Sequence, residues 1–248
     1  MAMQQMAAEA AALKAKHDRA AARRARGSLI LEAHDLLGGN RSVAVCSLIR
    51  LACTVRLTQG YWMSDHEVTQ AEYQAVMGSN PSQFKGDLNR PVEEVSWDDA
   101  VAYCKKLTER ERAAVRITAQ QEYRLPTESE WEYAARAGTT GARHGESSAI
   151  GWHEGNHGSG TNPVKQKAPN AWGLHDMMGN VYEWCSDIYG KYPTGSVTNP
   201  TGPGSGSDRV YRGGCWYTEP WRSAKRNGNL PSIQGDGLGF RTALSEVR

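Results

Sequence analysis

Residues 173–184 read Gly-Leu-His-Asp-Met-Met-Gly-Asn-Val-Tyr-Glu-Trp, and the interpretation of the whole chain begins from this stretch. Its small, acidic and aromatic residues alternate at a spacing that neither an amphipathic helix nor a plain strand requires. Asp176 and Glu183 can supply side-chain oxygens to a hard cation. Gly179 and Asn180 between them allow a tight turn that aims backbone carbonyls inward. The same residues also fit a polar turn between two buried stretches, and the sequence leaves both interpretations open.

The stretch resembles a signature of the formylglycine-generating enzyme family, also called the sulfatase-modifying factor family. Other motifs of that family accompany it in the family's order and together are far more specific than any one alone. These motifs are Glu67-Val68-Thr69, Pro91-Val92, Val95-Ser96-Trp97, Arg124 to Glu132 (RLPTESEWE), Arg212-Gly213-Gly214 and Gly239-Phe240-Arg241. The resemblance spans about Cys53 to Leu244. It implies an α+β, C-type lectin-like fold that is loop-rich, with short helices packed on small antiparallel sheets.

Composition agrees with a loop-rich fold. The 248 residues include eight Trp, ten Tyr and 26 Gly but only two Phe, which indicates large aromatics held among turns.

A net charge of +2 gives no general case for nucleic-acid or membrane binding. No apolar run approaches the roughly 20 residues of a transmembrane helix, and the N-terminus lacks the apolar middle of a secretory signal. We therefore expect a cytoplasmic protein.

The five cysteines are odd in number and show no Cys-x-x-Cys or Cys/His zinc spacing. They are Cys46, Cys53, Cys104, Cys185 and Cys215. We expect buried free thiols and neither a disulfide framework nor a structural zinc.

The first 50 residues depart from the family pattern, because the family's usual opening hairpin signature is absent. Residues 1–26 are rich in Ala and carry six basic against two acidic side chains, which favours a solvated helix or disorder. A basic arm that binds nucleic acid or an acidic partner is the alternative. Residues 42–57 read as one or two buried strands. We therefore divide the chain into an atypical N-terminal extension, 1–50, and the family domain, 51–248.

Three capping boxes predict three short helices in the family domain. They pair Thr69 with Glu72, Ser96 with Asp99, and Thr127 with Glu130. The first helix should stop at Gly78 and the third at Gly138. The second should pack an apolar stripe on the sheet, made of Val101, Cys104 and Leu107. Residues 139–170 and 192–207 are expected to be surface loops, the second leading into a strand at 209–212.

The oxidase chemistry of the family is where this sequence departs most. In those members two cysteines bind copper(I), and oxygen converts a substrate cysteine in a Cys-x-Pro-x-Arg motif to formylglycine. Paired thiolates are needed because soft ligands select Cu(I). Here the two positions fall on Thr218 and Ser223, so copper binding is not expected. Cys215 takes the place of a family serine, as a packed thiol or, if Arg212 and Arg222 lie close, as a reactive thiolate.

The segment that builds the family's substrate cleft remains rich in aromatic and polar residues, as recognition surfaces are. The candidate binding residues are Trp216, Tyr217, Thr218, Glu219, Trp221, Arg222, Arg226, Asn229, Ile233 and Gln234. Their expected partner is an unidentified protein or small-molecule ligand. Trp216 and Arg226 can equally be braces of the loop.

The resemblance also implies a structural calcium ion in residues 173–184. Carried over by position, its ligands would be Asp176, Gly179, Val181 and Glu183. Asp stands where the family has Asn, which keeps an oxygen ligand and adds negative charge.

Three hypotheses about function follow. The first is a ligand- or protein-binding module that has lost the oxidase chemistry. The second is an enzyme, either a divergent formylglycine-generating oxidoreductase or a relative of the sulfoxide synthases, although the chain lacks room for the latter's helical domain. The third resembles the variable proteins of diversity-generating retroelements, which display a hypervariable C-terminal segment on this fold; here that segment would be residues 216–237.

Overall fold

The computed structural model describes residues 30–32, 43–48, 51–219 and 222–247, with side chains from Thr54 onward. The chain divides into two compact units, residues 1–30 and 31–248. Only Ile30 of the first unit is described, so the account below concerns the second. The basic arm expected at residues 1–26 lies outside the described residues.

The three helices expected from the capping boxes are confirmed. They are α3 (Gln70–Met77), α4 (Trp97–Ala113) and α5 (Glu128–Arg136), and each begins with both hydrogen bonds of its capping box. Helix α3 ends at Gly78 in the left-handed conformation, as glycine permits. Helix α5 ends slightly earlier than expected, because Ala137 already adopts a left-handed φ of 44° before Gly138. A further short helix, α6 (Ser147–Ile150), lies within the expected loop 139–170.

The apolar face of α4 differs from the expected stripe. Val101 is 38% exposed, whereas Cys104 and Leu107 are buried together with Ala100 and Tyr103. Residues that recur at every third position shift gradually around a helix. Residues whose spacing alternates between three and four positions stay on one face. Including Val101 in the stripe was therefore wrong, and Ala100 and Tyr103 take its place.

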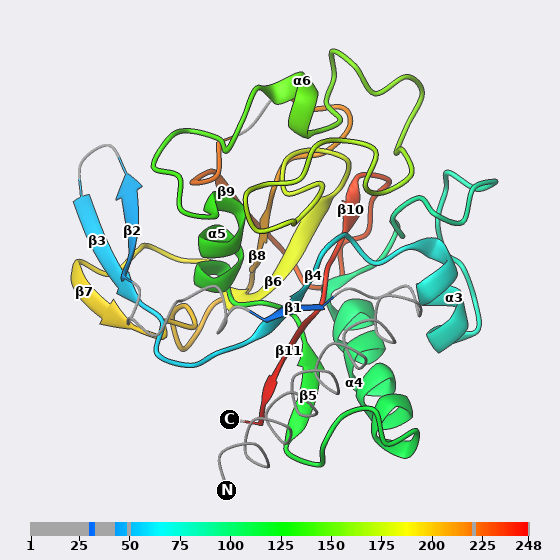
Figure 1. The fold of residues 1–248 in the computed structure, drawn as a ribbon, viewed down its shortest axis with the longest axis horizontal. Coiled ribbons are helices and arrows are strands. Elements are labelled where there is room, and N and C mark those ends of the chain that lie inside the picture. The colour runs from blue at the N-terminus through cyan, green and yellow to red at the C-terminus, as the bar shows by residue number, and fades with distance from the viewer. Residues whose placement is uncertain (1–29, 33–42, 49–50, 220–221, 248) are drawn as a thin grey trace, which may run out of the picture. The chain divides into compact units, whose positions relative to one another are not determined.

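The strands form three small sheets, arranged as Figure 1 shows. The first contains β1 (Ile30–Glu32), β4 (Trp62–Ser64), β11 (Ala243–Glu246) and β5 (Gln121–Arg124) in that order. The second contains β10 (Leu238–Gly239), β6 (Tyr182–Ile188), β8 (Arg209–Arg212) and β9 (Arg226–Asn229). The third contains β2 (Val43–Leu48), β3 (Leu51–Arg56) and β7 (Gly195–Thr198). Most registered pairs are antiparallel, but β10 runs parallel to β6 and β7 parallel to β3.

Two of the strand predictions are confirmed and one loop prediction is wrong. Residues 42–57 supply the paired strands β2 and β3, and the strand expected at 209–212 is β8. Residues 192–207, expected to be a loop throughout, contain β7. The sequence Gly-Ser-Val-Thr has little intrinsic preference for a strand. Its pairing with β3 is therefore what makes it one.

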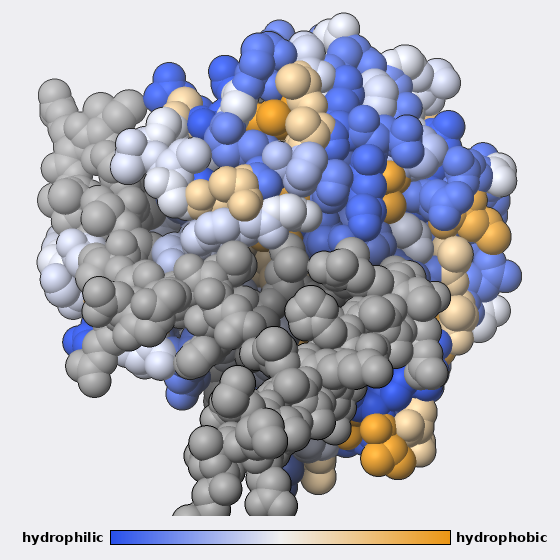
Figure 2. Space-filling view, viewed as in Figure 1, coloured by the Kyte–Doolittle hydropathy of each residue, from blue (hydrophilic) through white to orange (hydrophobic). Residues whose placement is uncertain are grey.

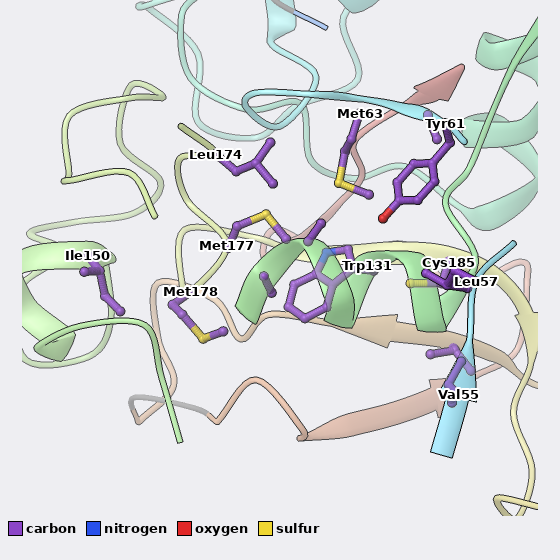
Figure 3. Packing of buried hydrophobic residues seen from close by; sticks show 14 residues of the cluster. Val55, Leu57, Tyr61, Met63, Trp131, Ile150, Leu174, Met177, Met178 and Cys185 are labelled. Atoms are coloured by element: carbon purple, nitrogen blue, oxygen red, sulfur yellow. The ribbon is translucent and has the colours of Figure 1, made fainter. Parts of the chain in front are cut away.

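Two clusters of buried apolar side chains form the core of the described residues. The first surrounds Trp131 of α5, and Figure 3 shows its indole among Tyr61, Met63 and Met177. The second contains Trp184 of β6, the neighbour of Glu183. Both Trp side chains are fully buried. Truncation of such a Trp to Ala typically costs about 3–5 kcal/mol, so each indole contributes strongly to the stability of its cluster.

The free cysteines of the part of the chain with described side chains, Cys104, Cys185 and Cys215, are buried as expected. Figure 2 shows that the visible described surface is mostly hydrophilic with scattered apolar residues. No described helix has the length and apolar character needed to cross a membrane.

Candidate functional site

The turn at residues 179–180 joins the start of β6 to the C-terminal segment. A Cβ on Gly179 would lie 2.0 Å from the carbonyl oxygen of Trp152, so only glycine fits there. The Gly179 N–H donates to the Gly213 carbonyl at 3.0 Å. The Trp216 N–H donates to the Asn180 carbonyl at 2.9 Å. Residues 173–184 and the segment that begins at Gly213 are therefore joined by these backbone hydrogen bonds.

Glu183 lies at the centre of this unit with its side chain fully buried. Its carboxylate accepts hydrogen bonds from Arg241 Nε at 2.6 Å and Nη2 at 2.7 Å. It also accepts one from Trp131 Nε1 at 2.7 Å. The arginine fork and the indole together satisfy both carboxylate oxygens, and Arg241 supplies the opposite charge.

Two further carboxylates are buried close to Glu183. Glu67 accepts hydrogen bonds from Asn180 Nδ2 at 2.7 Å and from the Val181 N–H at 3.0 Å. Burial, followed by the negative charges of Asp176 and Glu183, raises the pKa of Glu67 well above its usual value. Asp176, whose backbone is left-handed with φ of 56°, accepts the Lys165 N–H at Oδ2. Burial also raises the pKa of Asp176.

The two carboxylates among the predicted calcium ligands have different surroundings. Asp176 Oδ1 is buried without a hydrogen-bond partner among the described residues, which would suit a cation. Glu183, however, already has Arg241 as its positive partner. No group of three or more His, Cys, Asp or Glu side chains in the described ranges is placed to hold a metal ion. The calcium site stays a prediction from the sequence.

A second charged cluster flanks the Asp176 loop. The His66 side chain is almost fully buried, with Nδ1 at 2.5 Å from Asp65 Oδ1 and Nε2 at 3.5 Å from Glu72 Oε2. Lys165 Nζ donates to the other oxygen of Asp65 at 2.8 Å. Burial by itself lowers the pKa of His66, but the hydrogen bonds and charges of Asp65 and Glu72 raise it to about 9. His66 is therefore protonated at neutral pH.

Cys215, which takes the place of the family serine, begins a turn that Thr218 closes. Its thiol is fully buried, and burial raises the pKa of Cys215 to about 11. The Thr218 hydroxyl accepts the Cys215 N–H and donates to the Cys215 carbonyl, each at 3.0 Å. A cavity of only about 10 Å³, enough for about one water molecule, lies beside this turn. Cys215 is thus a protonated thiol in a tight turn at neutral pH.

The two positions of the family's copper-binding cysteines carry no thiol. Thr218 closes the turn just described, and Ser223 is fully buried. The Arg212 guanidinium, considered above as a possible neighbour of Cys215, is directed to Glu132 at 2.5 Å and to the Ser223 carbonyl at 2.8 Å. Arg222 is exposed.

The Trp216 side chain anchors the C-terminal segment to the rest of the domain. Its indole N–H donates to the Asp236 carbonyl at 3.1 Å. Its ring packs edge-on against Phe84 and Tyr217, with ring centroids 5.3 and 4.9 Å away, and a tilted His157 ring lies at 4.8 Å. These contacts tie residues 216–236 to two other loops of the domain.

Several side chains of the segment that follows Trp216 face solvent, and we call this set the C-terminal surface. Its members are Tyr217 (47% exposed), Leu230 (46%) and Ile233 (37%), together with the exposed Glu219 and Gln234. The Tyr217 ring lies against Gly237, where an added Cβ would approach it to 2.7 Å. Sequence reasoning missed Leu230, whose signal is a large apolar residue just beyond a short polar strand.

Two further predicted binding residues make contacts within the domain. Arg226 pairs with both oxygens of Glu128 at 2.6 Å. Asn229 is half-buried at the end of β9, where its side chain accepts the Leu230 N–H. Trp221 lies outside the described residues.

The fold and site define a sulfatase-modifying factor domain with a C-type lectin-like architecture. The chain belongs to this family, because residues 21–246 match the sulfatase-modifying factor enzyme 1-like domain.

Among its relatives is the formylglycine-generating enzyme of Streptomyces coelicolor, 37% identical over 187 residues that cover 65% of this chain and 55% of that protein. The Mus musculus formylglycine-generating enzyme is 37% identical over 182 residues, covering 64% of this chain and 45% of that protein. The chain thus spans about half the length of these enzymes. A solved structure, Treponema denticola variable protein 1, is similar with a TM-score of 0.77 and 32% identity, covering 87% of this chain and 94% of that one.

Proposed function

We propose that this domain is a recognition module that binds a protein or small-molecule ligand through the C-terminal surface, without copper-dependent oxidation. The observation that carries the proposal is the exposure of Tyr217, Leu230 and Ile233. Single exposed apolar residues need no explanation, but these three fall within 17 residues of sequence, and one of them, Tyr217, packs on the fixed indole of Trp216.

The support beneath this surface favours recognition, because ordered side chains lose little conformational freedom on binding. Trp216 is held by a hydrogen bond and three ring contacts, and Tyr217 rests on Gly237. Aromatic side chains on a rigid frame are the residues that carry most binding energy in protein interfaces.

Oxidase activity is disfavoured by the chemistry of the turn. Copper(I) needs soft ligands, and a protonated Cys215 with a threonine and a buried serine at the paired positions offers no thiolate pair. We expect purified protein loaded with copper(I) not to convert a Cys-x-Pro-x-Arg peptide to its formylglycine form. Mass spectrometry of the peptide measures this, and conversion that depends on both protein and oxygen would support the divergent oxidoreductase instead.

Binding itself is tested by site-specific photo-crosslinking in the source cell. A photoreactive amino acid at position 217 or 233 should capture the same partner. The matched control is position 115, because Val115 is 89% exposed at the end of α4. Equal capture at all three positions, or none at 217 and 233, would contradict the proposal.

A second candidate function is that of a variable protein that displays changeable residues at 216–237. The similarity to Treponema denticola variable protein 1 favours it, since that match covers most of both chains. Sequencing the genomic neighbourhood tests it. A reverse transcriptase beside the gene, with a near-identical repeat of the 216–237 coding segment differing at adenines, is the expected result, and its absence would remove this candidate while leaving the recognition module intact.

A further inference from the structure

A cavity of about 310 Å³ lies apart from the C-terminal surface, between α5, the end of β6 and the segment 190–203. Cavities of this size hold small organic molecules. Its walls are largely apolar, and its lining includes Val55, Tyr133, Tyr192, Val197, Pro200 and Pro203.

Two of the three acidic side chains in this lining are neutralised by arginines. Glu128 holds Arg226 through both oxygens at 2.6 Å and also accepts the Tyr192 hydroxyl at 3.0 Å. Glu132 pairs with Arg212 at 2.5 Å and with Arg136 at 2.8 Å. These contacts leave both carboxylates with a compensating positive charge.

Asp187 is the third acidic residue, and it has no such compensation. It is only 3% exposed, and its Oδ2 accepts the Glu128 N–H at 2.8 Å and the Ser186 hydroxyl at 3.2 Å. Among the described residues, no donor bonds Oδ1 and neither oxygen forms an ion pair with Lys or Arg, although Lys191 and Arg136 also line the cavity. Burial, together with the negative charges of Glu128 and Glu130, raises the pKa of Asp187 to about 7. A positive charge placed here would be stabilised.

We propose that this cavity binds a small organic amine, whose ammonium group donates to Asp187 while its apolar body packs against Val197, Pro200 and Tyr133. An ammonium supplies the missing hydrogen-bond donor and the missing positive charge at once. A carboxylate ligand would instead bring a second negative charge beside Asp187. A neutral alcohol could donate one hydrogen bond but would bring no positive charge to favour the ionised carboxylate.

The competing explanation is that Asp187 only caps α5, since its Oδ2 accepts the first amide of that helix. The two roles use different oxygens of the same carboxylate. Asp187→Asn separates them, because asparagine keeps an oxygen for the Glu128 N–H but loses the charge. The cap should survive this substitution, and the amine site should not.

The test is calorimetric titration of the full chain with phenethylamine, 2-phenylethanol and phenylacetate, which share one apolar body. We expect saturable binding of phenethylamine, at least about tenfold weaker binding of the alcohol, and no binding of the acid, because a charge-assisted hydrogen bond is lost in each case. Asp187→Asn should weaken phenethylamine binding by about tenfold or more. The matched control Asp98→Asn, at an exposed position in the first turn of α4, should leave binding unchanged.

Val197→Trp provides a second variant, because its indole would fill the cavity from β7 and should abolish binding. If Asp187→Asn fails to fold, the proposal is still tested by Val197→Trp and by the selectivity of the wild-type protein among the three probes. Absence of saturable phenethylamine binding, equal binding of amine and alcohol, or unchanged binding in folded Asp187→Asn would each overturn the proposal.

Discussion

Replacement of Arg241 by methionine should be among the most destabilising single substitutions in this chain. Arg241 is fully buried and donates to both oxygens of Glu183, to the His175 carbonyl at 2.9 Å and to the Ser64 carbonyl at 3.2 Å. Methionine approximates the length of the side chain but removes the charge. Three buried carboxylates, those of Glu183, Glu67 and Asp176, would then share one region without a guanidinium among them.

The magnitude follows from that loss of compensation. Removing one partner of a buried ion pair costs about 3–5 kcal/mol, because the remaining charge stays buried. A chain of this size loses about 2–4 °C of melting temperature per kcal/mol, which gives a fall of about 6–20 °C. Folded domains are stable by only about 5–15 kcal/mol, so the variant should lie close to the limit of folding.

Chemical denaturation followed by circular dichroism measures the free energy of unfolding directly. The matched control is Arg116→Met, because the Arg116 side chain is 43% exposed in its ion pair with Glu111 and such pairs are worth about 0–1 kcal/mol. The double variant Arg241→Met, Glu183→Met should lose less than the sum of its two single variants, since neither partner is then left alone. A loss for Arg241→Met no larger than that of Arg116→Met would refute the reasoning.

Three further predictions concern other parts of the chain. The calcium site predicted at residues 173–184 requires a melting temperature that rises with calcium, because an ion that binds only the folded state stabilises it, and Glu183→Gln should weaken this rise; a melt indifferent to calcium and to chelator would contradict the site. The folded pKa of His66, about 9, exceeds its unfolded value, so the stability it contributes is complete below about pH 6.5 and is lost as pH rises through 9; thermal melts across this range should show a decline that His66→Gln reduces. A variant lacking residues 1–26 should melt with the full chain, since that segment has almost no apolar surface to bury, and a clear drop in melting temperature would contradict this.

The features that the sequence determined by itself are local. Each capping box spans four residues, so its hydrogen bonds close within one turn and fix where α3, α4 and α5 begin whatever surrounds them. The turn at Gly179 is local in the same sense, because its left-handed backbone favours glycine. Motif order then identified the family, since several short signatures at the right spacing are improbable together.

The features that only the tertiary structure decided are pairings between distant residues. Glu183 meets Arg241 across 58 positions, and Arg226 meets Glu128 across 98, so no local pattern separates these bracing arginines from binding ones. The strand β7 forms only because it pairs with β3, which lies far from it in the sequence. Asp187 reads as an ordinary acidic residue in the sequence. Its buried, uncompensated carboxylate exists because α5 and the segment 190–203 close around it, and burial, which the sequence does not specify, sets its chemistry.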